Sequence, residues 1–177
     1  IYSLATGEHT LKAIAQFMLS IVSSNSKYDS VQRGHSSFTL QEENGYRLFR
    51  DNCSSCHTEP FFTNFSFENN GLPLDTALHD TGRMKITNDP NDSLKFKVPS
   101  LRNIEFSYPY MHDGRFKHLS EVLKHYTEGV EKSKTLSPRL QKPIVLSSNE
   151  KVDLTAFLLT LTDKTFLFDL RYSYPRK

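Results

Sequence analysis

The chain has 177 residues, with 22 basic and 20 acidic side chains and a formal net charge of +2. This length suits a single domain, and the near balance of charge gives no sign of a nucleic-acid-binding surface. No stretch approaches the roughly 18 apolar residues of a membrane span. The 13 Phe and 8 Tyr residues are unusually many, and most of them are expected in a hydrophobic core.

A helix with one apolar face is predicted near the N-terminus. Its apolar residues follow the i, i+3, i+4, i+7, i+11 spacing of a single helical face; they are Leu11, Ile14, Ala15, Met18 and Val22. A methionine in such a stripe usually fills the core, so Met18 is expected to be buried. The polar residues 23–26 suit a turn, and the polar stretch that continues through Ser37 is expected to connect two packed units.

A second helix begins at Thr39-Leu40-Gln41-Glu42, a capping box that satisfies the first free amide groups of a helix. It is expected to deliver Cys53 at its end. Gly45 lies inside it, where glycine costs about 1 kcal/mol relative to alanine, so another element is expected to approach its backbone closely. The candidate is a late helix capped by Ser147-Ser148-Asn149-Glu150, with Leu154, Phe157, Leu158 and Leu161 as its apolar residues.

The five residues Cys53-Ser54-Ser55-Cys56-His57 have the attachment pattern of a c-type haem. Two thiols at i and i+3 can each add to one vinyl group of the same porphyrin, and the histidine that follows is then held under the iron as an axial ligand. A glycine-bearing helix that leads into this motif and is crossed by the last apolar helix is the architecture of class I cytochrome c.

Three other interpretations of the two cysteines are less well supported. A structural zinc site needs four ligands, but the chain has only these two cysteines. A thioredoxin-like redox site requires a preceding strand, whereas the segment before Cys53 has a helical pattern. A disulfide between residues three apart closes a very small loop and constrains little of the unfolded chain. Haem attachment is therefore the favoured interpretation.

Residues 58–100 show little helical periodicity and contain turn formers such as Asn69-Asn70-Gly71. A flat apolar cofactor needs irregular chain around its rim, so a long ordered loop is expected here; a short exposed hairpin is the alternative. Further on, Leu119, Val122, Leu123 and Tyr126 form one helical stripe. Tyr126 is thus expected to face the interior, either as a haem ligand or as an ordinary buried tyrosine.

Seven blocks of the chain together resemble the bacterial dihaem cytochrome c peroxidases and their MauG-like relatives. The resemblance extends over about residues 5–165, with the blocks in the family's order and spacing. They are Gly45 to Phe49, Cys53 to His57, Asn69 to Pro73, Asp80 to Arg83, Phe96 to Asn103, Tyr108 to Gly114 and Leu119 to Tyr126. What they resemble is the C-terminal half of such proteins, which carries the electron-transferring haem.

This resemblance implies a mostly α protein, with a class I cytochrome c fold and long irregular loops that wrap the haem. It divides the chain into a linker helix and connector from the preceding half (residues 1–37), the cytochrome c domain (38–165) and a C-terminal tail (166–177). Because the chain begins at Ile1, where the family's linker between halves would begin, we expect a fragment of a dihaem enzyme.

The second axial ligand of the iron stays open on the sequence alone. In the family this ligand comes fourteen residues after the histidine of the Pro-Tyr-x-His block, as Met in the classical peroxidases and as Tyr in the MauG-like branch. Counting from His112 leads to Tyr126. Met111 is the main alternative, because many single-haem cytochromes take a methionine from an irregular loop. His118 and His125 are weaker candidates, and His112 is expected to fix its own loop.

The resemblance also implies smaller roles at other positions. Ser107 and Pro109 match positions whose backbone carbonyls help to hold a calcium ion between the two halves, and carbonyl oxygen suits that cation. The side-chain ligand from the other half is absent here. Arg102, together with Arg83 and Lys97, is expected to pair with haem propionates; a solvated surface charge is the alternative.

The chain departs from the family in carrying one Cys-x-x-Cys-His motif and no Trp, so none of its residues is expected to be catalytic. The expected function is electron transfer within a peroxide-reducing or MauG-like oxidising enzyme; the alternative is a stand-alone monohaem electron carrier. Expected partners are the N-terminal haem domain, a small electron donor (a cytochrome or a cupredoxin) and a second copy in a homodimer. The motif favours the periplasm, because haem attachment to cysteine pairs occurs outside the bacterial cytoplasm.

Overall fold

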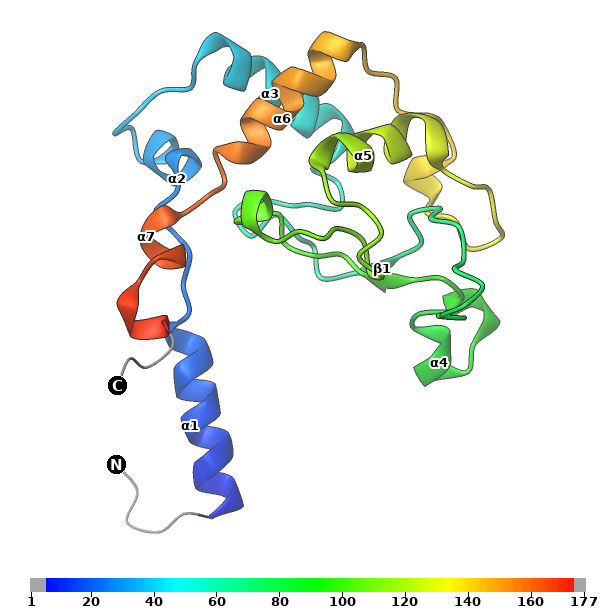
Figure 1. Cartoon of the computed structure of the whole chain (residues 1–177), viewed down its shortest axis with the longest axis horizontal. Coiled ribbons are helices and arrows are strands. Elements are labelled where there is room, and N and C mark those ends of the chain that lie inside the picture. Colours follow the sequence, from blue (N-terminus) through cyan, green and yellow to red (C-terminus); the bar gives the residue numbers. More distant parts are fainter. Residues whose placement is uncertain (1–5, 174–177) are drawn as a thin grey trace.

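The computed structural model describes residues 6–173 and is mostly helical, with long irregular segments between the helices (Figure 1). The mostly α fold with long loops is thus confirmed. The helices are α1 (Gly7–Ser20), α2 (Lys27–Gln32), α3 (Leu40–Asn52), α4 (Met84–Thr87), α5 (Leu119–Lys124), α6 (Ser148–Leu159) and α7 (Lys164–Leu167). The strands β1 (Phe67–Glu68) and β2 (Phe96–Lys97) form one short antiparallel pair. None of the helices within residues 6–173 combines the length and apolar character that crossing a bilayer requires.

Both predicted capping boxes are present. The Thr39 side chain accepts a hydrogen bond from the Glu42 amide at 3.3 Å, and the Glu42 carboxylate accepts one from the Thr39 amide at 2.7 Å. Ser147 and Glu150 make the same reciprocal pair at the start of α6, at 3.3 and 2.8 Å. Because these bonds satisfy amides that a helix start otherwise leaves free, they fix where α3 and α6 begin.

Helices α3 and α6 cross at Gly45, as expected. A Cβ atom at this position would lie 2.0 Å from the Asp153 carbonyl oxygen and 2.8 Å from Phe157 Cβ. Only a residue without a side chain allows the two backbones to come this close. The crossing buries Phe49 of α3 and Phe157 of α6 completely, and their ring centroids are 5.1 Å apart.

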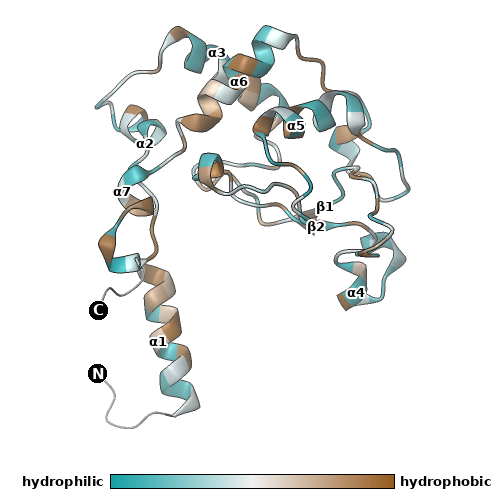
Figure 2. Cartoon of the chain, viewed as in Figure 1, coloured by the Kyte–Doolittle hydropathy of each residue, from teal (hydrophilic) through white to brown (hydrophobic). Residues whose placement is uncertain are grey.

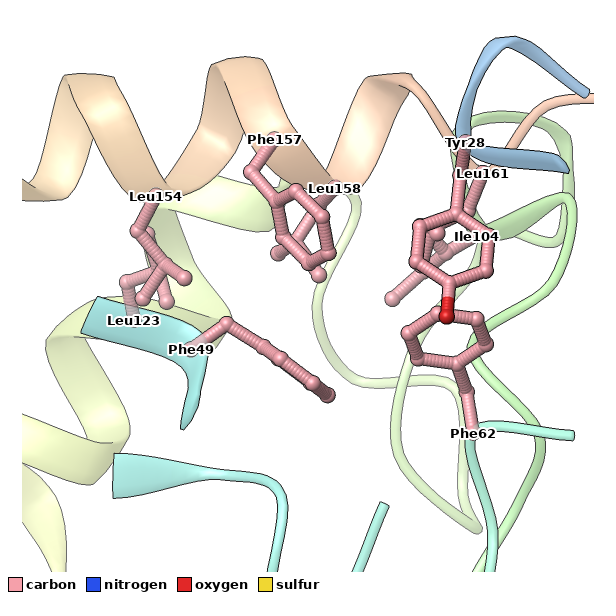
Figure 3. Packing of buried hydrophobic residues seen from close by; sticks show 9 residues of the cluster. All are labelled: Tyr28, Phe49, Phe62, Ile104, Leu123, Leu154, Phe157, Leu158 and Leu161. Carbon is pink, nitrogen blue, oxygen red and sulfur yellow. The ribbon is translucent and has the colours of Figure 1, made fainter. Parts of the chain in front are cut away.

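The hydrophobic core gathers on this crossing, where α5 and two loops complete it. Figure 3 shows Phe49, Leu154 and Phe157 between the helices, with Tyr28 and Phe62 next to each other at one end of the group. The Tyr28 and Phe62 rings meet edge to face at 4.8 Å. The nine core residues are Tyr28, Phe49, Phe62, Ile104, Leu123, Leu154, Phe157, Leu158 and Leu161. Phe62 joins this core directly to the loop that follows the Cys-x-x-Cys-His motif.

The predicted N-terminal helix exists, but its predicted burial is wrong. Helix α1 extends away from the rest of the domain (Figure 1), and no residue within it is buried. Met18, predicted to fill the core, is 64% exposed, and Figure 2 shows hydrophobic residues along α1, away from the rest of the domain. Helical periodicity identifies an apolar face but not what covers it. At the end of α1, the Tyr172 ring contacts Phe17 and the Tyr172 hydroxyl donates a hydrogen bond to the Ser20 carbonyl.

Helix α2 lies where a polar connector was predicted. Ser26 caps it, and Tyr28 and Asp29 are buried. At six residues the helix is too short to show a periodic pattern. Its position is fixed by an ion pair, because both terminal nitrogens of Arg102 donate to the Asp29 carboxylate, at 2.9 and 2.8 Å. The segment therefore packs on the domain as an integral part of it.

Candidate functional site

The Cys-x-x-Cys-His residues form a tight turn at the end of α3. Cys53 ends the helix and donates its amide to the Phe49 carbonyl at 2.8 Å, while the amides of Cys56 and His57 return to the Cys53 carbonyl at 3.2 and 3.0 Å. Both cysteines are free and partly buried. Within residues 6–173, no three His, Cys, Asp or Glu side chains form a group that could hold a metal ion.

The His57 ring is oriented by backbone carbonyls. Its Nδ1 atom lies 3.0 Å from the Phe62 oxygen and 3.1 Å from the Pro99 oxygen. Carbonyls only accept hydrogen bonds, so Nδ1 carries the ring hydrogen and Nε2 keeps its lone pair. Burial lowers the pKa of His57, against the opposing effect of these two bonds. A neutral imidazole with a fixed tautomer is the form that ligates a metal, and such orienting bonds typically support it.

Both thiols are protonated at neutral pH. Burial raises the pKa of Cys53 to about 12, and the neighbouring Cys56 adds to this effect. Burial also raises the pKa of Cys56, although a hydrogen bond with Ser55 acts in the opposite direction. Two neutral thiols beside an oriented imidazole are the donor set that a c-type haem requires, so the residues present fit this group.

The two candidates for the second axial ligand meet at Asn70. The Asn70 side-chain nitrogen donates to the Met111 sulfur at 3.6 Å, and the same side chain hydrogen-bonds to the Tyr126 phenol. The Asn70 side-chain oxygen is occupied by the Leu72 amide at 3.2 Å, which fixes the orientation of the amide group. Tyr126 also lies close enough to Cys53 and Cys56 that a negative charge on either sulfur would raise the pKa of its phenol. The structure thus brings Tyr126 and Met111 to the side on which the thiols lie.

Tyr126 lies in a distorted helical turn. Helix α5 ends at Lys124, and residues His125–Gly129 continue as a π-helical turn. Such turns are rare and occur preferentially at functional sites. Tyr126 is half-buried, and burial raises the pKa of its phenol while the Asn70 hydrogen bond lowers it. The predicted inward direction of Tyr126 agrees with these contacts, although the predicted regular helix ends before this residue.

The remaining histidine candidates have other partners. His125 is buried, and its Nε2 atom lies 3.0 Å from the Asn70 carbonyl oxygen. His118 is the exposed residue that precedes α5. His112 stacks on Phe96 with ring centroids 3.7 Å apart, which agrees with the expectation that it fixes its own loop. These contacts leave Tyr126 and Met111 as the two candidates for the second ligand.

Arg102 has a different partner from the predicted haem propionate. Its terminal nitrogens bind Asp29, and its Nε donates to the Pro60 carbonyl at 3.0 Å. The pair is largely buried, with the Arg102 side chain 14% exposed, so a solvated surface charge is not its role either. Sequence reasoning could not identify this pair, because Asp29 lies in the short helix that the pattern did not reveal. Arg102 anchors α2 to the loop that follows His57.

Two other predicted positions lie at the surface. Ser107 and Pro109 are both exposed, next to the end of a 3-10 turn at Ile104–Phe106. Their carbonyls remain candidate calcium ligands on the grounds of the family resemblance alone. Of the other basic candidates, Arg83 pairs with Asp92 at 3.0 Å and Lys97 lies over the Phe65 ring at 5.5 Å.

Asn70 and the carbonyls that orient His57 were missed by sequence reasoning. Asn69-Asn70-Gly71 was interpreted only as a turn, and backbone carbonyls leave no signal in side-chain identity. The hint in the sequence was the pair of asparagines before Gly71, because a turn does not require two asparagines. In the structure Gly71 has a left-handed conformation, with φ 72°.

Comparisons with known proteins place this geometry in context. No family model matches the chain. The methylamine utilization protein MauG of Methylorubrum extorquens is 37% identical over 158 residues, which cover 86% of this chain and 44% of the relative. The cytochrome c551 peroxidase of Nitrosomonas europaea is 36% identical over 154 residues, or 85% of this chain and 43% of the relative.

Two solved structures of dihaem peroxidase and MauG-like proteins are similar in fold to this chain. A MauG-like protein associated with microbial copper homeostasis superposes with a TM-score of 0.78 at 34% identity, over 86% of this chain and 56% of that one. The dihaem peroxidase BthA of Burkholderia thailandensis shares the fold, with a TM-score of 0.63 at 23% identity over 81% of this chain and 47% of that one.

The fold is that of a cytochrome c domain. Over about 85% of its length the chain is homologous to the dihaem cytochrome c peroxidases and MauG proteins. The chain spans less than half the length of the curated relatives it matches.

Proposed function

We propose that this chain is the c-type haem electron-transfer domain of a dihaem cytochrome c peroxidase-like protein, corresponding to its C-terminal half. The observation that carries the proposal is the orientation of His57. Its Nδ1 hydrogen is held by the carbonyls of Phe62 and Pro99, which directs the Nε2 lone pair away from them, and the free thiols of Cys53 and Cys56 lie in the same turn.

Cys53 and Cys56 would hold the haem as thioethers, since each thiol can add its sulfur to one carbon of a vinyl group and its hydrogen to the other without an oxidant. His57 would hold the iron through its Nε2 lone pair. When bound, the haem would supply one-electron redox chemistry, which the iron-binding residues and their hydrogen bonds tune.

Tyr126 would be the second residue that holds the iron, with Met111 as the alternative. Burial raises the pKa of the Tyr126 phenol, and the hydrogen bond from the Asn70 amide opposes this rise, which favours the phenolate form needed for ligation. The same amide donates to the Met111 sulfur, which occupies a lone pair of that atom. Asn70 is thus a positioning residue that favours Tyr126 over Met111.

The activity of the whole protein belongs to the part beyond this chain. We infer hydrogen peroxide reduction or a MauG-like oxidation at a second haem in the preceding half, supplied with electrons by a small soluble cytochrome or cupredoxin in the periplasm. A calcium ion held between the halves by the carbonyls of Ser107 and Pro109, and assembly into a homodimer, complete the proposal. A stand-alone electron carrier is the second candidate, because the chain carries a single Cys-x-x-Cys-His motif.

The test is covalent haem attachment in a bacterial host with cytochrome c maturation. We expect the protein to keep its colour after acid-acetone extraction, and we expect Cys53→Ala/Cys56→Ala to lose it. His57→Ala should change the absorption spectrum, whereas the matched control His35→Ala, at an exposed position, should not. A folded, colourless protein with two reactive thiols would overturn the proposal. A second motif upstream in the full gene would favour the enzyme over the carrier.

A further inference from the structure

One exposed segment of the domain has an excess of positive charge. Residues 131–142, here called the basic segment, carry four basic side chains against the single acid Glu131, in a chain whose total charge is only +2. The four are Lys132, Lys134, Arg139 and Lys142; all are exposed, and none forms an ion pair with a residue between 6 and 173. These four charges make a local positive patch, which would attract a partner of opposite charge.

The basic segment (yellow in Figure 1) is held in a defined position. The buried Asn69 side chain donates to the hydroxyls of Ser133 and Thr135, at 3.0 and 2.9 Å. The Ser137 amide donates to the Asn69 carbonyl at 3.0 Å, and the Glu131 amide to the Gly71 carbonyl at 2.9 Å. Gly71 permits this approach, since a Cβ there would lie 2.6 Å from a methyl carbon of Val130. The cations thus project from an ordered backbone.

This position places the basic segment beside the proposed haem site. Asn69, which holds the segment, directly precedes Asn70, which contacts Met111 and Tyr126. At the other end of the segment, the guanidinium of Arg139 lies near enough to the Cys56 thiol to act on it electrostatically. The basic segment therefore adjoins the side of the domain where Cys56 would carry its thioether in the proposed holoprotein, with Arg139 nearest to that residue.

We propose that the basic segment is the docking surface for a soluble redox protein with an acidic face, which exchanges electrons with the haem held by Cys53, Cys56 and His57. The inference rests on the proposed function and names the partner of that same site. Redox encounters bury little surface, so their rates depend on long-range attraction between opposite charges. The four exposed cations, none of which forms an ion pair within residues 6–173, provide that attraction.

Two double charge reversals form the test. Lys134→Glu/Arg139→Glu alters the basic segment. Lys12→Glu/Lys164→Glu changes the net charge by the same amount on α1 and α7, which lie on the opposite limb of the molecule in Figure 1. All four side chains are exposed, so neither variant disturbs the core. The probe is plastocyanin, an acidic cupredoxin, with the basic mitochondrial cytochrome c as the partner of opposite charge.

Binding is measured first, by NMR titration of redox-inactive zinc-substituted plastocyanin at low ionic strength. We expect Lys134→Glu/Arg139→Glu to weaken binding by about tenfold, and Lys12→Glu/Lys164→Glu to stay within about twofold of the natural protein. At about 0.5 M salt, where screening reduces the Debye length to roughly 4 Å, the difference should vanish. Equal binding by both variants would overturn the inference.

Electron transfer is measured next, by stopped-flow mixing of the pre-reduced protein with oxidised plastocyanin. With plastocyanin at low salt, Lys134→Glu/Arg139→Glu should react about tenfold more slowly than the natural protein. With cytochrome c, the same variant should react faster than the natural protein. Reduction by dithionite separates this result from the proposed function. A protein without a dithionite-reducible haem spectrum contradicts the function itself, whereas a reducible protein whose rates ignore the basic segment contradicts only the docking surface.

Discussion

At the scale of single residues, Tyr126 and Met111 compete for one coordination position. Both contact the Asn70 side chain, and a phenolate stabilises ferric iron more than a thioether does. We expect Tyr126→Phe to change the ferric absorption and electron paramagnetic resonance spectra of the haem-loaded protein and to raise its midpoint potential. Met111→Leu is the matched control and should leave both spectra unchanged. The reverse pattern would assign Met111 as the ligand.

The sequence predicted the site residues that belong to a local pattern, and it missed those that act through contacts between distant segments. Cys53, Cys56 and His57 carry a local pattern in which spacing alone brings the groups together, and Tyr126 was found by its position on a helical stripe. Asn70 acts through contacts with segments far away in the chain, which no local pattern reveals. The sequence shows the charge of Arg102 but not its partner, so a haem propionate was predicted as the partner. Asp29, which Arg102 binds in the structure, lies in a helix that was not predicted.

At the scale of elements, the crossing of α3 and α6 is the most sensitive contact of the fold. We expect Gly45→Ala to destabilise the domain by about 3 kcal/mol, at the upper end of overpacking costs, because the new Cβ would meet the Asp153 backbone. Urea unfolding followed by circular dichroism measures the loss. Gly7→Ala in α1 is the control; nothing lies within 4 Å of a Cβ there, so it should be neutral or slightly stabilising. Equal effects of the two substitutions would contradict the proposed tight crossing.

Helices with a strong local sequence signal were predicted, and the helix with a weak signal was missed. The capping boxes at Thr39 and Ser147 predicted the starts of α3 and α6, because a cap is a contact between residues three apart. The six-residue α2 gave no periodic signal, and its start depends on a Ser26–Asp29 pair that resembles ordinary polar loop sequence. The face of α1 was predicted, but its exposure was not, because exposure depends on what the rest of the molecule places beside it.

At the scale of the whole molecule, two buried carboxylates attach the N-terminal segments to the domain. Asp29 binds Arg102 and caps α2. Asp163 accepts hydrogen bonds from the amides of Ser24 and Asn25, at 3.0 and 2.9 Å, and also caps α7. Burial alone would raise the pKa of each carboxyl. Hydrogen bonds, from Arg102 and Ser26 to Asp29 and from Thr165 and backbone amides to Asp163, outweigh burial and hold both pKa values below the usual range.

These lowered pKa values make the domain sensitive to acid. Above a pH of about 5, well over the unfolded pKa of an aspartate, both carboxyls are ionised in the folded and the unfolded chain, and their stabilising contribution is fully present. As the pH falls below that value, the unfolded chain takes up protons that the folded chain resists, so the free energy of unfolding decreases until the folded carboxyls are protonated too. The N-terminal segments should therefore loosen in mild acid.

Asp29→Asn tests this acid sensitivity. It leaves the buried Arg102 without its counter-charge, and we expect a loss of about 3 kcal/mol in the free energy of unfolding at neutral pH. Because the variant has no carboxyl to protonate, its stability should also fall less steeply between about pH 4 and pH 2. Urea unfolding across that range measures both effects. Asp51→Asn, at an exposed position, is the matched control and should keep the natural slope. An unchanged slope in Asp29→Asn would show that the acid sensitivity resides in other carboxyls.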